Sequence, residues 1–313
     1  MAKRILLFAA IALGSCATSS TIRLEPARLA DWTQSLRDSQ NDEPYLLVYH
    51  KGNRRLILVA AQHDNDPAGA TFRLVRSAFD IWPVDSVIVE GAASDAGPNS
   101  LSLMALADEP LNAEKQQPGG ETVPAIQGAR RVGAKVWGGE ANDTDVLRLA
   151  QANGIEQADV LGFYVLRVIP QWLRDGTLSG VRDAKLPGLV DRQLARSLRG
   201  LGMAAAPFSD FGGWAEWYRR TNGKLIGDGL DIEEVGPLSD GPWPSNRIAW
   251  SISKARDSHL LKVIEGQLFE AKSVVVVFGG SHAAILQPAL NAGLGRPCYF
   301  GSDFAAARAM CLT

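Results

Sequence analysis

The sequence predicts an α/β protein with a central, mostly parallel sheet, an N-terminal β-hairpin and a helical insertion that caps the sheet. Short apolar runs alternate with helix-like segments, and most of these runs are apolar at every position. Such runs are typical of strands that helices cover on both faces. The 313 residues are 46% hydrophobic and 21% charged, which suits a sizeable core. A net charge of -2, without any run of Lys or Arg, argues against nucleic acid as a partner.

Residues 1–15 have the features of a secretory signal peptide. Lys3 and Arg4 form a positive start, and the apolar run 5–13 is shorter than the ~20 residues of a membrane-spanning helix. Small residues then lead to Cys16. Leu-Gly-Ser-Cys resembles the lipobox of bacterial lipoproteins, in which the Cys thiol is diacylated and becomes the mature N-terminus. The alternative is an ordinary signal peptide that happens to carry a Cys.

The lipobox predicts an exported protein that acyl chains hold on a membrane. Two or three chains make a durable anchor, whereas a single chain binds only marginally. We expect residues 16–40 to be the lipidated Cys and a tether, and residues 41–313 to be the folded domain. Ala17 favours the outer membrane, facing the periplasm, as the location within the cell envelope.

The other two cysteines, Cys298 and Cys311, form an even pair in a chain predicted to enter an oxidising compartment. We therefore predict a disulfide between them. A bridge that closes so short a loop contributes roughly 3 kcal/mol to stability. The alternative is a pair of buried thiols.

The folded domain is predicted to begin with a β-hairpin. Residues 45–50 and 55–61 are rich in Leu, Val and Ile, and the segment between them has the composition of a turn, including Gly52. Asp66 and Pro67 then predict the start of a helix, with Asp as the N-cap and Pro in the first turn.

The remaining chain alternates between predicted strands and helices. Short apolar strands are expected over 86–89, 135–137, 273–278 and 298–300, and helices over 125–132 and 247–270. The middle of the chain, from about 143 to 223, is almost wholly helical in pattern and forms the predicted insertion. Residues 223–246 are dense in Gly, Pro and Asp, which predicts loops.

Four polar side chains lie at or just beyond the ends of predicted strands: His63, Glu90, Glu140 and His282. Ligands of open α/β sheets bind beyond the carboxyl ends of the strands, so these residues are expected to converge. Two imidazoles and a carboxylate are a common ligand set for a catalytic divalent metal. We therefore predict that His63, Glu90 and His282 bind one divalent cation, which is Mn, Co or Zn. The plainer alternative is that each is a structural polar residue at a strand end.

The arrangement resembles the TraB/GumN/Tiki family, which belongs to a wider group with erythromycin-esterase-like and ChaN-like proteins. Its marks are a hairpin leading into GxxH, a strand ending in Glu-Gly, and an Arg-Asn/Asp helix before a strand with a second GxxH. Here these marks read Ala60-Ala61-Gln62-His63, Glu90-Gly91, Arg256-Asp257-Ser258-His259 and Gly279-Gly280-Ser281-His282. The resemblance runs in order over about residues 45–292.

The resemblance implies a metal-dependent, peptidase-like hydrolase that acts on a peptide or small-molecule substrate. In this reading Glu140 is the general base or a fourth metal ligand. Arg256 orients a carboxylate or stabilises developing negative charge, unless it only forms a salt bridge that holds the long helix on the sheet. Ala60 replaces the Gly of the first GxxH, which would distort the site if close backbone approach is needed there.

Two other functions are compatible with parts of the sequence. The main alternative is a non-catalytic surface lipoprotein that binds a ligand or haem, as ChaN-like proteins do, in a pocket lined by some of the eight Trp. A serine hydrolase is disfavoured. Ser281 lies in a near match to the nucleophile elbow, but no His follows His282 to complete a triad.

Overall fold

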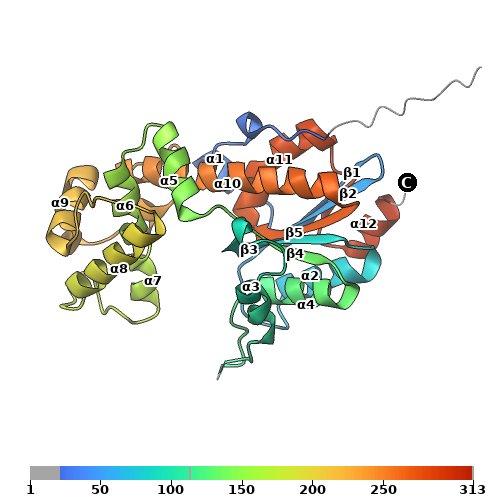
Figure 1. The fold of residues 1–313 in the computed structure, drawn as a ribbon, viewed down its shortest axis with the longest axis horizontal. Coiled ribbons are helices and arrows are strands. Elements are labelled where there is room, and N and C mark those ends of the chain that lie inside the picture. Colours follow the sequence, from blue (N-terminus) through green and yellow to red (C-terminus); the bar gives the residue numbers. More distant parts are fainter. Residues whose placement is uncertain (1–21, 113, 312–313) are drawn as a thin grey trace, which may run out of the picture.

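The computed structural model describes residues 22–112 and 114–311, so the predictions for residues 1–15 and Cys16 lie outside the described residues. Within the described chain, six strands form one sheet in the order β4-β3-β5-β2-β1-β6 (Figure 1). The strands are β1 (Tyr45–Lys51), β2 (Arg54–Ala61), β3 (Ser86–Ala93), β4 (Lys135–Glu140), β5 (Ser273–Gly279) and β6 (Tyr299–Gly301).

The sheet is mostly parallel, which confirms the predicted fold class. Strands β4, β3, β5 and β2 run in one direction, and β1 is antiparallel to both of its neighbours, β2 and β6. The first two strands form the expected hairpin, and Gly52 in its turn has a φ of 60°, which glycine adopts without strain. Because the four parallel strands end at one edge of the sheet, side chains that follow them gather there.

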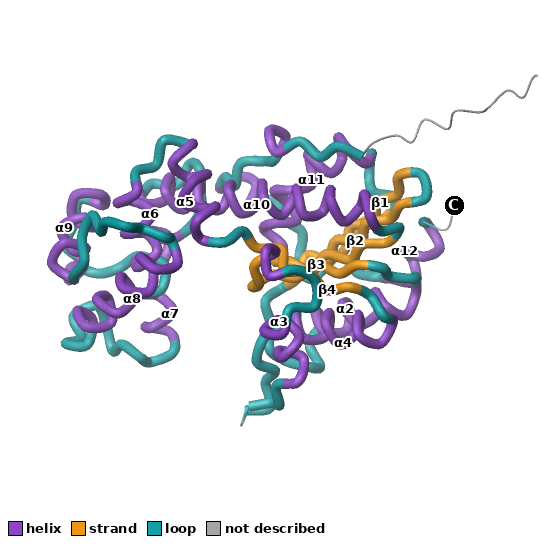
Figure 2. Tube along the Cα trace, in the orientation of Figure 1, coloured by secondary structure: helices purple, strands orange, loops and turns teal. Residues whose placement is uncertain are grey.

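Helices cover both faces of this sheet (Figures 1 and 2). Along β5, Val275 and Val277 are buried on one face, whereas Val274 and Val276 are buried on the other, which explains why the strand is apolar at every position. The covering helices are α2 (Ala70–Ile81), α4 (Thr122–Val132) and α12 (Phe304–Met310) on the first face, and α10 (Pro244–Glu270) and α11 (Gly280–Leu294) on the second.

A third hydrophobic core lies beside the sheet, in a helical lobe at the left of Figure 1. Trp214, Trp217 and Tyr218 are almost completely buried at its centre. The early turns of α10 pack into this lobe through Ile248 and Ile252, and its later turns pack on the sheet. The lobe is the predicted helical insertion, and its helices are α5 (Asp143–Ala152), α6 (Gln157–Leu166), α7 (Ile169–Arg174), α8 (Leu186–Gly200) and α9 (Phe211–Asn222).

Short elements complete the described chain. They are α1 (Gln34–Asp38), α3 (Leu101–Ala105) and the 3-10 helices η1 (Pro26–Arg28), η2 (Ser94–Ala96), η3 (Leu106–Asp108), η4 (Ile226–Asp228) and η5 (Ile232–Val235). None of the helices in the described ranges combines the length and the apolar character that crossing a membrane requires.

The start of α2 differs from the sequence prediction. The helix begins at Ala70 and not at Asp66 or Pro67. The side chains of Asp64 and Asp66 accept hydrogen bonds from the backbone N–H groups two residues further along the chain, at 2.8 and 2.9 Å. These side-chain turns compete with the helix and delay its first turn.

Residues 22–40, expected to be part of a tether, are packed against the domain. Leu24, Leu29 and Trp32 are buried against the face of the sheet that carries α10 and α11. The backbone N–H of Ala30 also donates to the carbonyl of Ile285 in α11 at 3.0 Å. This part of the expected tether therefore packs on the domain, because three large apolar side chains spaced along it are buried against a hydrophobic surface.

Cys298 and Cys311 form a disulfide, as the sequence predicted, with their Cα atoms 5.6 Å apart. The bridge joins the chain just before β6 to the residue directly after α12. It therefore fastens the C-terminal helix to the edge of the sheet.

Candidate metal centre

The parallel register of three neighbouring strands brings the predicted residues to one edge of the sheet. Val59 in β2 and Val89 in β3 both pair with Val277 in β5. Glu90 comes immediately after this row, and His63 follows β2 by two residues. His282 is the third residue of α11, which starts directly after β5. The convergence that the sequence predicted is thus produced by strands that end side by side.

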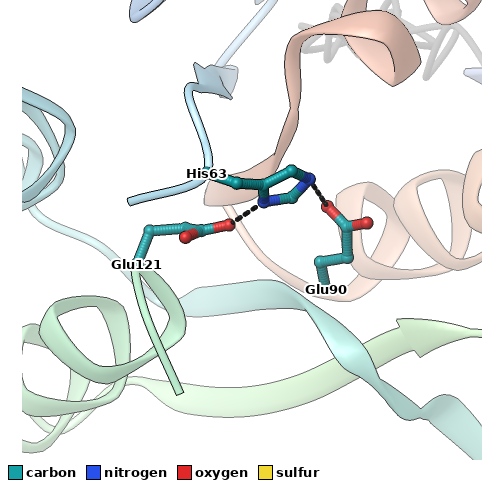
Figure 3. A group of neighbouring side chains, drawn as sticks. All are labelled: His63, Glu90 and Glu121. Carbon is teal, nitrogen blue, oxygen red and sulfur yellow. Dashed lines mark hydrogen bonds and ion pairs between the residues drawn. The ribbon is translucent and has the colours of Figure 1, made fainter. Parts of the chain in front are cut away.

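His63 lies between two carboxylates, as Figure 3 shows. Its Nδ1 is 2.6 Å from Oε1 of Glu121, and its Nε2 is 4.0 Å from Oε2 of Glu90. The hydrogen bond with Glu121, helped by the nearby charges of Glu90 and Glu43, outweighs burial and raises the pKa of the His63 imidazole to about 9. The side chain of His63 is 66% exposed, so this side of the centre is open to solvent.

His282 has the same arrangement on the buried side of the centre. Its Nδ1 is 2.5 Å from Oδ1 of Asp257 in α10, and its Nε2 is 3.7 Å from Oε1 of Glu90. Burial lowers the pKa of the His282 imidazole, but the negative charge and hydrogen bond of Asp257 prevail, and the net shift is upward. The side chains of His282 and Asp257 are only 10% and 1% exposed.

Glu90 is the carboxylate that the two imidazoles share. Its Oε2 accepts a hydrogen bond from the backbone N–H of Gly279 at 2.8 Å, which fixes the carboxylate at the start of α11. A Cβ at Gly279 would lie 2.9 Å from Nε2 of His63 and 3.5 Å from Oε2 of Glu90. A side chain at Gly279 would therefore push the imidazole of His63 out of its present position.

Arg256 and Glu140 form a paired group beside this carboxylate. The Nε and Nη2 of Arg256 donate to the two oxygens of Glu140 at 2.8 and 2.6 Å, and Nη2 is 3.8 Å from Oε1 of Glu90. Burial raises the pKa of Glu140, but the bond from Arg256 outweighs it and the net pKa is lowered. Both oxygens of Glu140 accept from Arg256 and its basicity is reduced, so its expected role as a general base or fourth metal ligand stays a prediction. Arg256 in α10 thus holds Glu140 at the end of β4 and faces Glu90, a geometry compatible both with a role toward a carboxylate and with a salt bridge that holds the long helix on the sheet.

Only part of the predicted donor set falls within a group of donors that could share a divalent cation. Within the described residues, His63, Glu90 and Glu121 form a group whose ligand atoms lie within 4.8 Å of one another. His282 is outside that close group and contacts the other oxygen of Glu90. Donors that share an ion at about 2.1 Å lie within about 4.2 Å of each other. The two Nε2-to-Glu90 distances satisfy this limit, and they run to different oxygens of Glu90. Imidazole and carboxylate donors suit Mn, Co and Zn alike.

Three carboxylates near the centre were missed by the sequence prediction. Glu121 comes from the loop before α4, where only the preceding Gly-Gly pair marks it. Asp257 was present in the Arg-Asp motif but received no role. Glu43, two residues before β1, packs against Gly280 at the start of α11, and burial raises the pKa of its carboxyl.

The alanine at the first GxxH-like motif does not disturb the site. Ala60 is fully buried and pairs with Phe278 in the regular register of β2 and β5. Its methyl group lies within the core on the α10 and α11 face. The expected distortion is absent because this position faces the core and not the imidazole of His63.

Two cavities share the wall formed by His63 and Glu90. One, of about 520 Å³, opens toward the loop that carries Gln116 and Glu121. The other, of about 300 Å³, lies between the sheet edge and the helical lobe and is also lined by His282. The chain matches no protein-family model, no curated protein and no solved structure.

Proposed function

We propose that this chain is an exported, lipid-anchored hydrolase that depends on a divalent metal and resembles the peptidase-like members of the TraB/GumN/Tiki family. The observation that carries the proposal is the pair of carboxylate-bound histidines that flank Glu90. Each imidazole has its Nδ1 occupied by a carboxylate and directs Nε2 toward Glu90. Metal-binding histidines commonly have this hydrogen-bonding partner, which fixes the tautomer and makes Nε2 more basic.

We assign the metal to Nε2 of His63, Nε2 of His282 and the carboxylate of Glu90. A bound divalent metal would polarise a substrate carbonyl and lower the pKa of a bound water. Glu121 and Asp257 orient the two imidazoles through Nδ1.

Glu43 is a second proposed proton acceptor beside Glu140. It packs against Gly280 at the start of α11, and its charge contributes to the raised pKa of His63. Its own raised pKa makes it a stronger base than an ordinary carboxylate. Arg256, held by Glu140, supplies a fixed positive charge next to Glu90, where negative charge develops during hydrolysis.

Elemental analysis of protein purified without chelator tests the proposal directly. Wild type is expected to carry close to one equivalent of Mn, Co or Zn, and His282→Ala and Glu90→Gln are each expected to lose it. His50→Ala is the matched control, because His50 pairs with Arg55 at the opposite end of the sheet. Its metal content is expected to equal that of wild type.

Two results would count against the metal hydrolase. One is a wild-type protein that never retains metal after titration with all three ions. The other is a Soret band on haem addition that depends on His63, which would support the ligand-binding alternative.

A further inference from the structure

The cavity between the sheet and the lobe has two unlike walls. The sheet side presents the polar groups of the candidate metal centre. The opposite side is apolar, with Phe163 from α6, Ile252 from α10, Val235 from the end of η5 and Pro237 from the loop between η5 and α10. At about 300 Å³ the cavity is at the lower limit of the ~300–1,000 Å³ typical of small-molecule sites. It therefore suits one apolar side chain with its flanking polar groups.

The lobe side also contributes one positively charged residue, Arg167, which immediately follows α6 and lines the same cavity. Its guanidinium lies 4.0 Å from the ring centre of Tyr164. The hydroxyl of Tyr164 is fixed in turn by a 2.9 Å hydrogen bond to Asp143. Stacking on an anchored ring limits the freedom of the guanidinium and leaves its N–H groups for other partners.

Arg167 is exposed, and no carboxylate of the described residues forms a salt bridge with it. The second arginine of this cavity, Arg256, already uses two N–H groups on Glu140. Arg167 is thus a guanidinium without an acidic partner among these residues, and it faces a cavity that contains the candidate metal centre. A planar guanidinium matches a carboxylate through two parallel hydrogen bonds.

We propose that Arg167 binds the terminal carboxylate of the substrate and that the substrate class is a peptide or acyl-amino acid ending in an apolar residue. The apolar lobe wall holds the side chain of that residue. The amide preceding it then faces the proposed centre. This inference rests on the proposed hydrolase activity. In that reaction, water adds its hydroxyl to the acyl carbon, the C–N bond breaks, and the remaining proton goes to the released amine.

Binding of two matched probes tests the role of Arg167 without requiring turnover. The probes are N-acetylphenylalanine, which has a free carboxylate, and N-acetylphenylalanine amide, which lacks the charge. Calorimetric titration of wild type is expected to show about tenfold tighter binding of the carboxylate. Arg167→Gln is expected to abolish this preference. Arg167→Lys is expected to retain part of it, because Lys keeps the positive charge but cannot donate two parallel hydrogen bonds.

Arg174→Gln is the matched control, since Arg174 is exposed, lies in the next helix of the lobe and does not line the cavity. It is expected to keep the wild-type preference. Circular dichroism of each variant checks folding. If Arg167→Gln fails to fold, the reduced preference of Arg167→Lys is the test of the proposal.

The outcomes separate this inference from the proposed hydrolase. A protein that binds metal but does not distinguish the two probes, or an Arg167→Gln variant that still does, overturns the role of Arg167 alone. A protein without metal or turnover that prefers the carboxylate through Arg167 overturns the hydrolase and leaves a carboxylate-binding site.

Discussion

Substitution of Asp257 by Asn removes the charge behind His282 while keeping an oxygen that can accept the Nδ1–H hydrogen bond. In the structure the two groups are 2.5 Å apart, and Oδ2 of Asp257 also accepts from the hydroxyl of Ser253 at 3.3 Å. Asn is close to Asp in size and fits the same space. The variant therefore isolates the electrostatic contribution of Asp257 to the basicity of Nε2.

The size of the effect follows from the burial of the pair. Loss of a carboxylate behind a metal-bound histidine typically reduces metal affinity about 10- to 100-fold, which corresponds to about 1.4 to 2.7 kcal/mol. Asp257 is only 1% exposed, so water does not screen its charge, and we expect the upper end of this range. Glu121→Gln should lie at the lower end: Glu121 is itself only 8% exposed, but the side chain of His63 is 66% exposed, so water screens this pair more than the buried His282–Asp257 pair.

The assay is a competition titration of Zn²⁺ or Mn²⁺ against a chromophoric chelator, with wild type, Asp257→Asn and Glu121→Gln measured in parallel. Thermal unfolding of the metal-free proteins shows whether any loss comes from altered folding. Unchanged affinity in a folded Asp257→Asn variant would refute the role assigned to this pair. A larger loss in Glu121→Gln than in Asp257→Asn would show that the argument from burial is wrong.

Three further predictions concern other parts of the chain. Gly279→Ala is expected to displace His63 and weaken metal binding in the same titration. Its unfolding free energy should change by less than about 1 kcal/mol, because a φ of -54° suits alanine. Replacing Cys298 and Cys311 by Ser should lower the unfolding free energy by about 3 kcal/mol in denaturant titrations, and an unchanged midpoint would contradict this. Cys16→Ser should abolish incorporation of labelled palmitate, whereas equal labelling of variant and wild type would exclude lipidation at this residue.

Sequence patterns predicted the sheet well because the residues that favour a strand locally are also the apolar residues that the helices on both faces bury. Residues 273–278 are apolar at every position, and the structure buries both faces of β5. The start of α2 was mispredicted because Asp66 and Pro67 are compatible with either a helix N-terminus or a turn. Hydrogen bonding to the side chains of Asp64 and Asp66 decides between the two, and the local sequence does not reveal it.

Part of the candidate site could be predicted from the positions of its residues after strands. His63 and His282 each follow a strand, and parallel strands bring their ends together whatever the sequence between them. Glu121 and Asp257 come from a loop and from the middle of a long helix, so their approach depends on how these elements pack. The pairing of Glu140 with Arg256 could not be predicted, because a position at the end of a strand does not show that Arg256 occupies both carboxylate oxygens.

The long helix α10 has a consequence for how the molecule unfolds. It is 27 residues long, or roughly 40 Å, and it is shared between two hydrophobic cores. Melting of the lobe alone would expose Ile248 and Ile252, and melting of the sheet layer alone would expose Leu261 and Ile264 on the same helix. The two parts are therefore expected to unfold in one cooperative transition, and a shortened chain without residues 143–222 would leave the first half of α10 unsupported.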